Sequence, residues 1–181
     1  MAALDLTRRT IAVIPGTGNV GSRLAFQYAK AGLSVVGPLE TREKLLKSLA
    51  SHLVDKIIVD VTNVHYLFGQ SEWGRISSTL LNRDALGAPA RWTTAFKATF
   101  AHFLREDLPD VNNPHTTFVA GDDPEAVATT IALVETIPGF KGANAGPLEN
   151  SRIVELLGPQ LVVLDKLNAG GKSFAYWKLG V

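Results

Sequence analysis

The 181-residue chain contains no cysteine, which excludes disulfide bonds, thiolate nucleophiles and metal centres built on cysteine. It also lacks a charge excess, because 18 lysines and arginines stand against 17 acidic residues for a net charge of +1. We therefore expect no binding to nucleic acid or to a membrane surface. No two of its four histidines have the spacing of metal ligands, so we expect no metal site.

Long hydrophobic runs are missing as well. No segment approaches the ~20 apolar residues of a membrane-spanning helix, and the N-terminus lacks the apolar core of a signal peptide. Hydrophobic residues nevertheless make up 46% of the chain, enough for a sizeable core at this length. These features predict a globular protein of the cytoplasm with one domain, or one domain and a small appendage.

The clearest motif is a glycine-rich turn after the apolar run Ile11–Ile14. Its residues match the pattern G-x-G-x-x-G and are Gly16, Thr17, Gly18, Asn19, Val20 and Gly21. The first glycine permits a sharp turn, the second leaves the backbone open to a pyrophosphate, and the third lets the following helix pack close to the strand. The start of that helix offers free N–H groups to an anion. The motif predicts a dinucleotide site; an ordinary strand-to-helix turn is the alternative.

The residues after the second strand, Leu33–Val36, are unusual for a dinucleotide fold. Such a strand usually ends with an acid for the ribose hydroxyls or with basic residues for a 2′-phosphate, but here Gly37 and Pro38 follow it. Glu40 lies about 20 residues beyond the glycine motif, where the acid is expected, and Arg42 could reach a 2′-phosphate. Alternatively, both are solvated residues in the first turn of the next helix.

Alternating strand and helix patterns continue along the chain. Ile57–Val61 predicts a strand buried on both faces, and Asn63, just beyond its carboxyl end, is either a cofactor contact or a plain turn residue. Further strands are expected at 91–96, 116–120 and 140–143, and helices at 39–53, 76–81, 124–137 and 150–167. The alternation predicts an α/β fold. Residues 64–90, rich in aromatics and glycine, predict a loop over a site or at a subunit contact.

Two features of the C-terminal third carry further expectations. Asp122 and Asp123 are adjacent acids, but Asp123 precedes a proline at the first helical position, so we interpret it as a helix cap. The helix at 150–167 has apolar residues around most of its circumference and must be covered on more than one side. We therefore expect it to form a subunit interface in a homodimer or to take a deep central position.

Three spaced motifs together resemble the family of coenzyme F420-dependent NADP oxidoreductases. They are Gly16–Gly21, Val59–Asn63, and Val119–Asp123 with Ala145–Arg152. The resemblance implies a Rossmann-like, mostly parallel sheet with a small helical C-terminal region. It divides the chain into a dinucleotide-binding domain over residues 1–110 and an α/β region over 111–181 that carries the dimerisation helix. It also implies a shortened sheet, because family members have a further α/β unit after the second strand.

The resemblance implies an NAD(P)-dependent oxidoreductase that transfers hydride between NADPH and a deazaflavin or a related small acceptor. NAD is the alternative cofactor, and coenzyme F420 or a flavin the second substrate. The glycine motif would hold the pyrophosphate; Pro38, Asn63, Ala95 and Phe96 would line the nicotinamide; Gly146, Pro147 and Leu148 would face the second substrate. Hydride passes directly between two rings, so no catalytic side chain is expected.

Two departures from the family pattern support a second hypothesis. Of the 2′-phosphate site only Thr17 remains, and Lys97-Ala98-Thr99 replaces a stretch that contains asparagine or histidine in the family. The alternative function is a non-catalytic or vestigial dinucleotide-binding homodimer with a structural role.

Overall fold

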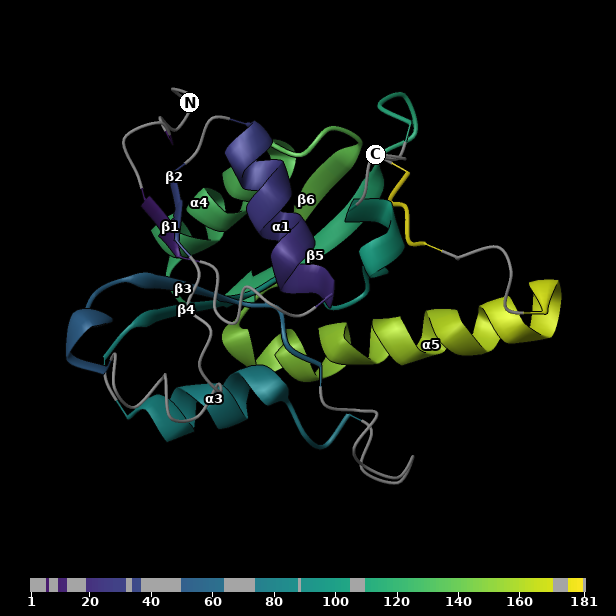
Figure 1. Cartoon of the computed structure of the whole chain (residues 1–181). Coiled ribbons are helices and arrows are strands. Elements are labelled where there is room, and N and C mark those ends of the chain that lie inside the picture. Colours follow the sequence, from purple (N-terminus) through teal and green to yellow (C-terminus); the bar gives the residue numbers. More distant parts are fainter. Residues whose placement is uncertain are drawn as a thin grey trace.

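The computed structural model describes Leu6 and residues 10–12, 19–31, 34–36, 50–63, 74–87, 89–104, 110–170 and 176–180. Strands and helices alternate along these residues (Figure 1). In chain order they are β1 (Thr10–Ala12), α1 (Asn19–Lys30), β2 (Ser34–Val36), the 3-10 helix η1 (Ala50–His52), β3 (Ile57–Asp60), α3 (Ser78–Leu86), β4 (Arg91–Thr94), η4 (Ala101–Leu104), β5 (His115–Gly121), α4 (Pro124–Glu135), β6 (Phe140–Asn144), η5 (Leu148–Asn150) and α5 (Ser151–Ala169). The predicted α/β class is confirmed.

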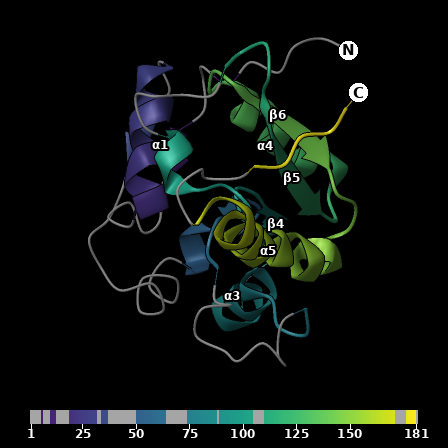
Figure 2. The same cartoon turned by 90° about the vertical axis from the view of Figure 1, so that its right-hand side faces the viewer.

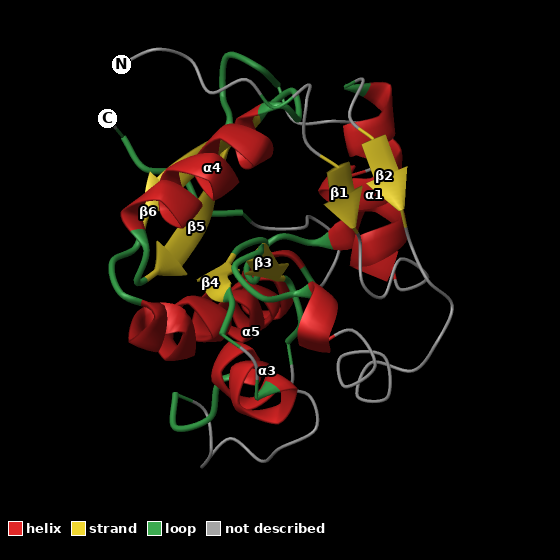
Figure 3. Cartoon of the chain, turned by 90° about the vertical axis from the view of Figure 1, so that its left-hand side faces the viewer, coloured by secondary structure: helices red, strands yellow, loops and turns green. Residues whose placement is uncertain are grey.

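The described strands form two sheets. One has the order β3-β4-β5-β6, in which β3 and β4 are parallel, β4 and β5 are antiparallel, and β5 and β6 are parallel. The other consists of the parallel pair β1 and β2, which lies beside α1 and apart from the larger sheet (Figure 3). The parallel pairs outnumber the antiparallel one, as the predicted mostly parallel sheet requires.

Helix α4 follows β5 as predicted. Asp123 is its N-cap and accepts a hydrogen bond from the Ala126 N–H at 2.9 Å, and Pro124 opens the first turn. Val127 and Val134 are buried toward the sheet. The helix lies close to β6, because a Cβ added to Gly142 would come within 2.8 Å of the Ile131 side chain. The capping interpretation of Asp123 is confirmed.

Helix α5 crosses the molecule on the same side of the sheet as α3 and extends past it at its C-terminal end (Figures 1 and 2). It ends at Gly170, whose φ of 62° gives the left-handed cap that glycine favours. Near its centre the helix packs closely on the chain beyond β4, since a Cβ on Gly158 would lie 2.6 Å from the Lys97 carbonyl oxygen. The long helix predicted at 150–167 is confirmed, with a shift of one or two residues at each end.

One core cluster joins α1 to the larger sheet. Leu24 and Tyr28 of α1 share it with Phe96, at the end of β4, and with Val119 of β5. Gln27 of α1 donates a hydrogen bond from Nε2 to a backbone carbonyl of η4 at 3.0 Å. The helix that follows the glycine motif therefore packs on the same core as the end of β4.

Several boundaries differ from the prediction. The strand expected over 91–96 ends at Thr94, because Phe96 has a φ of 57° that no strand accommodates. The helix expected at 76–81 spans Ser78–Leu86, between the N-cap Ser77 and the left-handed Gly87. Of the helix expected at 39–53, residues 39–49 lie outside the described residues and residues 50–52 form a 3-10 turn.

Candidate functional site

The candidate site lies where the parallel strands β3 and β4 end side by side. Asp60 is paired with Thr94 at the last position of both strands. In open α/β sheets, ligands bind at the carboxyl ends of parallel strands. The Ala95 N–H donates to the Asp60 carbonyl at 3.1 Å, which extends the pairing one residue past β4. Asn63 lies just beyond Asp60, the last residue of β3, and Phe96 just beyond Thr94, the last residue of β4, so two predicted cofactor contacts lie at the same edge.

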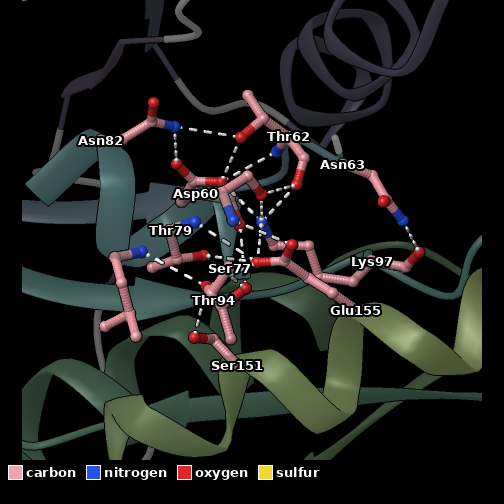
Figure 4. Close-up of polar contacts among 12 residues, drawn as sticks. Asp60, Thr62, Asn63, Ser77, Thr79, Asn82, Thr94, Lys97, Ser151 and Glu155 are labelled. Atoms are coloured by element: carbon pink, nitrogen blue, oxygen red, sulfur yellow. Dashed lines mark hydrogen bonds and ion pairs between the residues drawn. The ribbon is translucent and has the colours of Figure 1, made fainter. Parts of the chain in front are cut away.

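Asp60 is the first member of a buried polar cluster at this edge (Figure 4). Its Oδ1 accepts hydrogen bonds from the Thr62 N–H at 2.9 Å, from the Thr62 hydroxyl at 2.8 Å and from the Lys97 ammonium at 2.6 Å. Asn82 of α3 donates to its Oδ2. Burial alone would raise the pKa of Asp60, but the charge of Lys97 and these hydrogen bonds outweigh it and hold the pKa below its usual value.

Glu155 of α5 is the second acid of the cluster and caps the N-terminus of α3. Its carboxylate accepts from the Ser77 hydroxyl at 2.8 Å, from the Ser78 N–H at 2.9 Å and from the Thr79 N–H at 3.3 Å. The free N–H groups of a helix start and its dipole both favour an anion at this place. The Ser77 hydroxyl also lies 2.7 Å from that of Ser151. One carboxylate thus joins α5 to α3.

Lys97 links the two acids. Its ammonium lies 2.6 Å from Asp60 Oδ1 and 3.4 Å from Glu155 Oε1, and all three side chains are buried. It also donates to the Ser78 hydroxyl at 3.0 Å and to the Thr62 carbonyl. Isolated buried charges are strongly unfavourable, whereas a paired and hydrogen-bonded arrangement of this kind is tolerated. The cluster therefore fixes the end of β3, the start of α3 and the N-terminal part of α5 to one another.

The structure brings some predicted cofactor contacts together. Asn63 is half-buried and donates from Nδ2 to the Lys97 carbonyl at 3.3 Å. Ala95 and Phe96 belong to the core cluster and are 0% and 3% exposed, backbone included. A ligand at this edge would therefore meet the half-buried Asn63 side chain, whereas Phe96 lies beneath the surface.

The glycine motif is only partly described. Asn19, Val20 and Gly21 form the first turn of α1, with Gly21 buried and Val20 packed against the core cluster. Gly16, Thr17, Gly18 and Pro38 lie outside the described residues. The assignment of these residues to a cofactor stays a prediction.

Gly146, Pro147 and Leu148 lie at a different edge of the sheet. β5 is antiparallel to β4 and its last residue, Gly121, is paired with Thr93, so β5 ends toward the start of β4. The Gly121 N–H donates to the Gly146 carbonyl at 3.0 Å, and Asp122 Oδ1 accepts from the Leu148 N–H at 2.9 Å. The structure does not bring these residues to Asn63 and Phe96, and their contact with a second substrate stays a prediction.

The buried cluster was missed in the sequence. Two signals could have found it: Asp60 interrupts a run of apolar residues in its strand, and Glu155 does so in its helix. Acids at core positions need a cation or several hydrogen bonds, which makes a buried lysine such as Lys97 a candidate partner. In the sequence, however, Lys97 stands out only as a departure from the family pattern. Within the described part of the chain, no three histidine or acidic side chains gather as a metal site. Nor does that part contain a helix long and apolar enough to span a membrane.

Comparison with curated proteins finds a similarity that extends over most of the chain. The chain is 27% identical over 210 aligned positions to the F420-dependent NADP reductase of Methanothermobacter thermautotrophicus, covering 87% of this chain and 90% of the relative. Because the alignment is longer than the 181 residues of the chain, the relative contains residues that have no counterpart here. No protein-family profile matches the sequence.

Two solved structures resemble the fold. A provisionally assigned F420-dependent NADP reductase from Arthrobacter sp. FB24 superposes with a TM-score of 0.74 at 17% identity, covering 92% of this chain and 97% of the other. A hypothetical protein from Sinorhizobium meliloti reaches a TM-score of 0.54 at 18% identity, covering 73% and 82% of the two chains. The Rossmann-like α/β fold predicted from the sequence, with its C-terminal helix, is confirmed.

Proposed function

Because the predicted resemblance to F420-dependent NADP reductases is confirmed over most of the chain, we propose that this protein is an NAD(P)-dependent oxidoreductase. It transfers hydride between NADPH and a deazaflavin such as coenzyme F420, or a related small acceptor such as a flavin. The observation that carries the proposal is the alignment with an F420-dependent NADP reductase over 87% of this chain. We further propose that the protein acts in the cytoplasm as a homodimer.

The residues at the edge of the sheet fit a dinucleotide. Helix α1 begins at Asn19, inside the glycine motif, and its first turn contains no acidic residue. Its free N–H groups would therefore meet a pyrophosphate without competition from a carboxylate. A planar ring at the ends of β3 and β4 would meet the half-buried, uncharged side chain of Asn63.

The chemistry of the reaction belongs to the cofactor. Bound NADPH supplies a hydride from its nicotinamide ring, and the protein supplies binding, orientation and exclusion of water. The chain positions its own groups for this role: the glycine motif and α1 hold the phosphates, and Asn63 orients the ring beside the end of β4. NADPH would leave as NADP⁺, and the acceptor would take up one proton from solvent together with the hydride, so no side chain has to form a covalent bond.

Calorimetric titration with NADPH, NADH and NADP⁺ in parallel tests the proposal. We expect micromolar binding of at least one cofactor, followed by turnover with coenzyme F420 or a flavin. Gly18→Arg should abolish binding, because an arginine side chain would occupy the place of the pyrophosphate. Gly180→Arg is the matched control, since a Cβ at Gly180 meets nothing within 4 Å.

The titration also separates the two candidate functions. If none of the three cofactors binds, the oxidoreductase proposal is wrong and the protein is a structural relative of the reductases. If a cofactor binds and no acceptor is reduced, the protein is a dinucleotide-binding homodimer without turnover. Because the residues after Val36 depart from the family pattern, cofactor binding should be measured before turnover.

A further inference from the structure

Lys97 has a buried side chain directly beside the candidate site. It follows Phe96 at the end of β4, and its side chain is 0% exposed. Its ammonium contacts Asp60, Ser78 and Glu155 and donates to the Thr62 carbonyl (Figure 4). A lysine has three N–H donors and no acceptor, so these contacts use its full capacity. The ammonium cannot reach a ligand and acts only on its neighbours in the protein.

The other end of the same residue holds the neighbouring strand. The Lys97 carbonyl accepts the hydrogen bond from Asn63 Nδ2 at 3.3 Å, while its ammonium binds Asp60 and Thr62, which lie just before Asn63 in the chain. Lys97 therefore contacts three of the residues between the end of β3 and Asn63. Movement of its backbone or of its side chain would displace Asn63.

Phe96 is held in an uncommon backbone conformation next to this residue. Its φ of 57° lies in the left-handed region, which a bulky residue occupies only where its surroundings enforce it. Three contacts enforce it here. The Ala95 N–H donates to the Asp60 carbonyl, and the phenyl ring is buried in the core cluster. Lys97, the next residue in the chain, is held by the contacts of its ammonium with Asp60, Ser78 and Glu155.

From these contacts we propose that Lys97 is a positioning residue of the candidate site. It holds the half-buried Asn63 side chain where that side chain orients the nicotinamide ring. This inference rests on the proposed hydride transfer, a reaction in which a displacement of about 1 Å can cost 10²-fold in rate. The lysine itself neither touches the cofactor nor transfers a proton.

A useful variant removes the contacts by which Lys97 positions Asn63 without leaving both buried acids unpaired. Lys97→Met alone would leave two buried acids without their cation and would destabilise the fold. The double variant Lys97→Met/Asp60→Asn removes one charge of each sign, and Glu155 keeps its hydrogen bonds from Ser77 and Ser78. Arg83→Met/Asp84→Asn is the matched control, because it removes an ion pair of 3.0 Å whose side chains are 43% and 66% exposed.

Steady-state kinetics with NADPH and an acceptor that the wild type reduces give the main measurement. In the double variant we expect kcat to fall about 10- to 100-fold, while KM for NADPH changes less than about threefold because the phosphates are held at the glycine motif. The deuterium isotope effect on kcat with NADPH labelled at the transferred position should rise, because poor alignment makes hydride transfer rate-limiting. The surface control should match the wild type.

A milder variant covers the case in which the double variant does not fold. Ser78→Ala keeps all three charges of the cluster and removes one acceptor of the ammonium, so we expect a folded protein with a smaller fall in kcat, an unchanged KM and a raised isotope effect. Wild-type kcat and isotope effect in the folded variants would overturn the positioning role. A wild type that binds no dinucleotide or reduces no acceptor would instead refute the proposed function, and the role of Lys97 with it.

Discussion

The ammonium of Lys97 lies 2.6 Å from Oδ1 of Asp60, and the two side chains are 0% and 4% exposed. This ion pair joins residues 37 positions apart and ties the carboxyl ends of two parallel strands together. A charge pair so far from water contributes to the fold only as a complete unit, because either partner alone is a buried charge.

Removal of one partner should therefore be costly. We expect Asp60→Asn to lower the free energy of unfolding by about 3 kcal/mol, since among the described residues Lys97 keeps only the more distant Glu155 as a counter-charge. Urea denaturation at neutral pH measures the change. Asp84→Asn removes an acid of similar geometry from an exposed ion pair and should cost less than about 1 kcal/mol. Equal losses in the two variants would mean that burial does not strengthen the Asp60 pair.

The local elements could be predicted because their signals lie close together in the chain. Asp123 and Pro124 mark the start of α4, and Gly170 marks the end of α5, each through the backbone geometry that its residue type favours. The left-handed Phe96 was not predictable in this way, because phenylalanine has no preference for that conformation. It depends on packing between segments distant in sequence.

Part of the candidate site could also be predicted. Asn63 was found from its place after an apolar strand, and the structure puts it at the carboxyl edge as expected. Its anchor on Lys97 was not found, because the contact depends on how the chain continues past β4. To predict the contact of Lys97 with Glu155, the position of α5 must be known as well. Asp60, Lys97 and Glu155 lie far apart in the sequence, and no local pattern indicates that they meet.

The close approach of α5 to the site predicts a cost for a small substitution. Alanine normally favours a helix over glycine by about 1 kcal/mol, but a Cβ at Gly158 would lie 2.6 Å from the Lys97 carbonyl oxygen. We expect Gly158→Ala to lower the free energy of unfolding by about 1–3 kcal/mol, because α5 must move away from the backbone. Thermal or urea unfolding checks this, with Gly180→Ala as a control that meets no neighbour. A stabilised Gly158→Ala protein would contradict the packing.

Stability should also depend on pH through His115. Its ring stacks on Tyr176 at 3.7 Å between centroids and lies edge-on to Phe103 at 4.2 Å. Burial lowers the pKa of His115 to about 4 from the ordinary 6.5. Between these values the unfolded chain binds a proton that the folded protein does not, so the free energy of unfolding should fall as the pH drops from 6.5 toward 4. We expect a loss of about 1–2 kcal/mol over this pH range.

Two substitutions isolate this contribution. His115→Phe keeps an aromatic ring in the stack and removes the titrating group, so it should flatten the decline in stability between pH 7 and pH 4.5. His52→Phe removes an exposed histidine and should leave the decline as in the wild type. The urea midpoints at the two pH values provide the measurement. If stability declines as steeply in His115→Phe as in the wild type, groups other than His115 cause the decline.

The outer face of α5 is the basis for the proposed homodimer. Ile153, Val163, Leu164 and Leu167 are between 37% and 77% exposed, and at 100° per residue they fall within about 100° of the helix circumference. An exposed apolar stripe of this kind is typical of a protein interface, and a second copy of the same helix would cover it with an equal stripe.

Sedimentation velocity at micromolar concentration should show a dimer for the wild type. Leu167→Glu places a charge at the most exposed of the four stripe positions, at 77%, and should weaken association at least about tenfold without loss of stability, because the side chain has few contacts within the chain. Val111→Glu, at an apolar position that is 65% exposed outside α5, should leave the dimer intact. A monomeric wild type would refute the homodimer, whereas a dimer that Leu167→Glu does not weaken would place the interface on another surface.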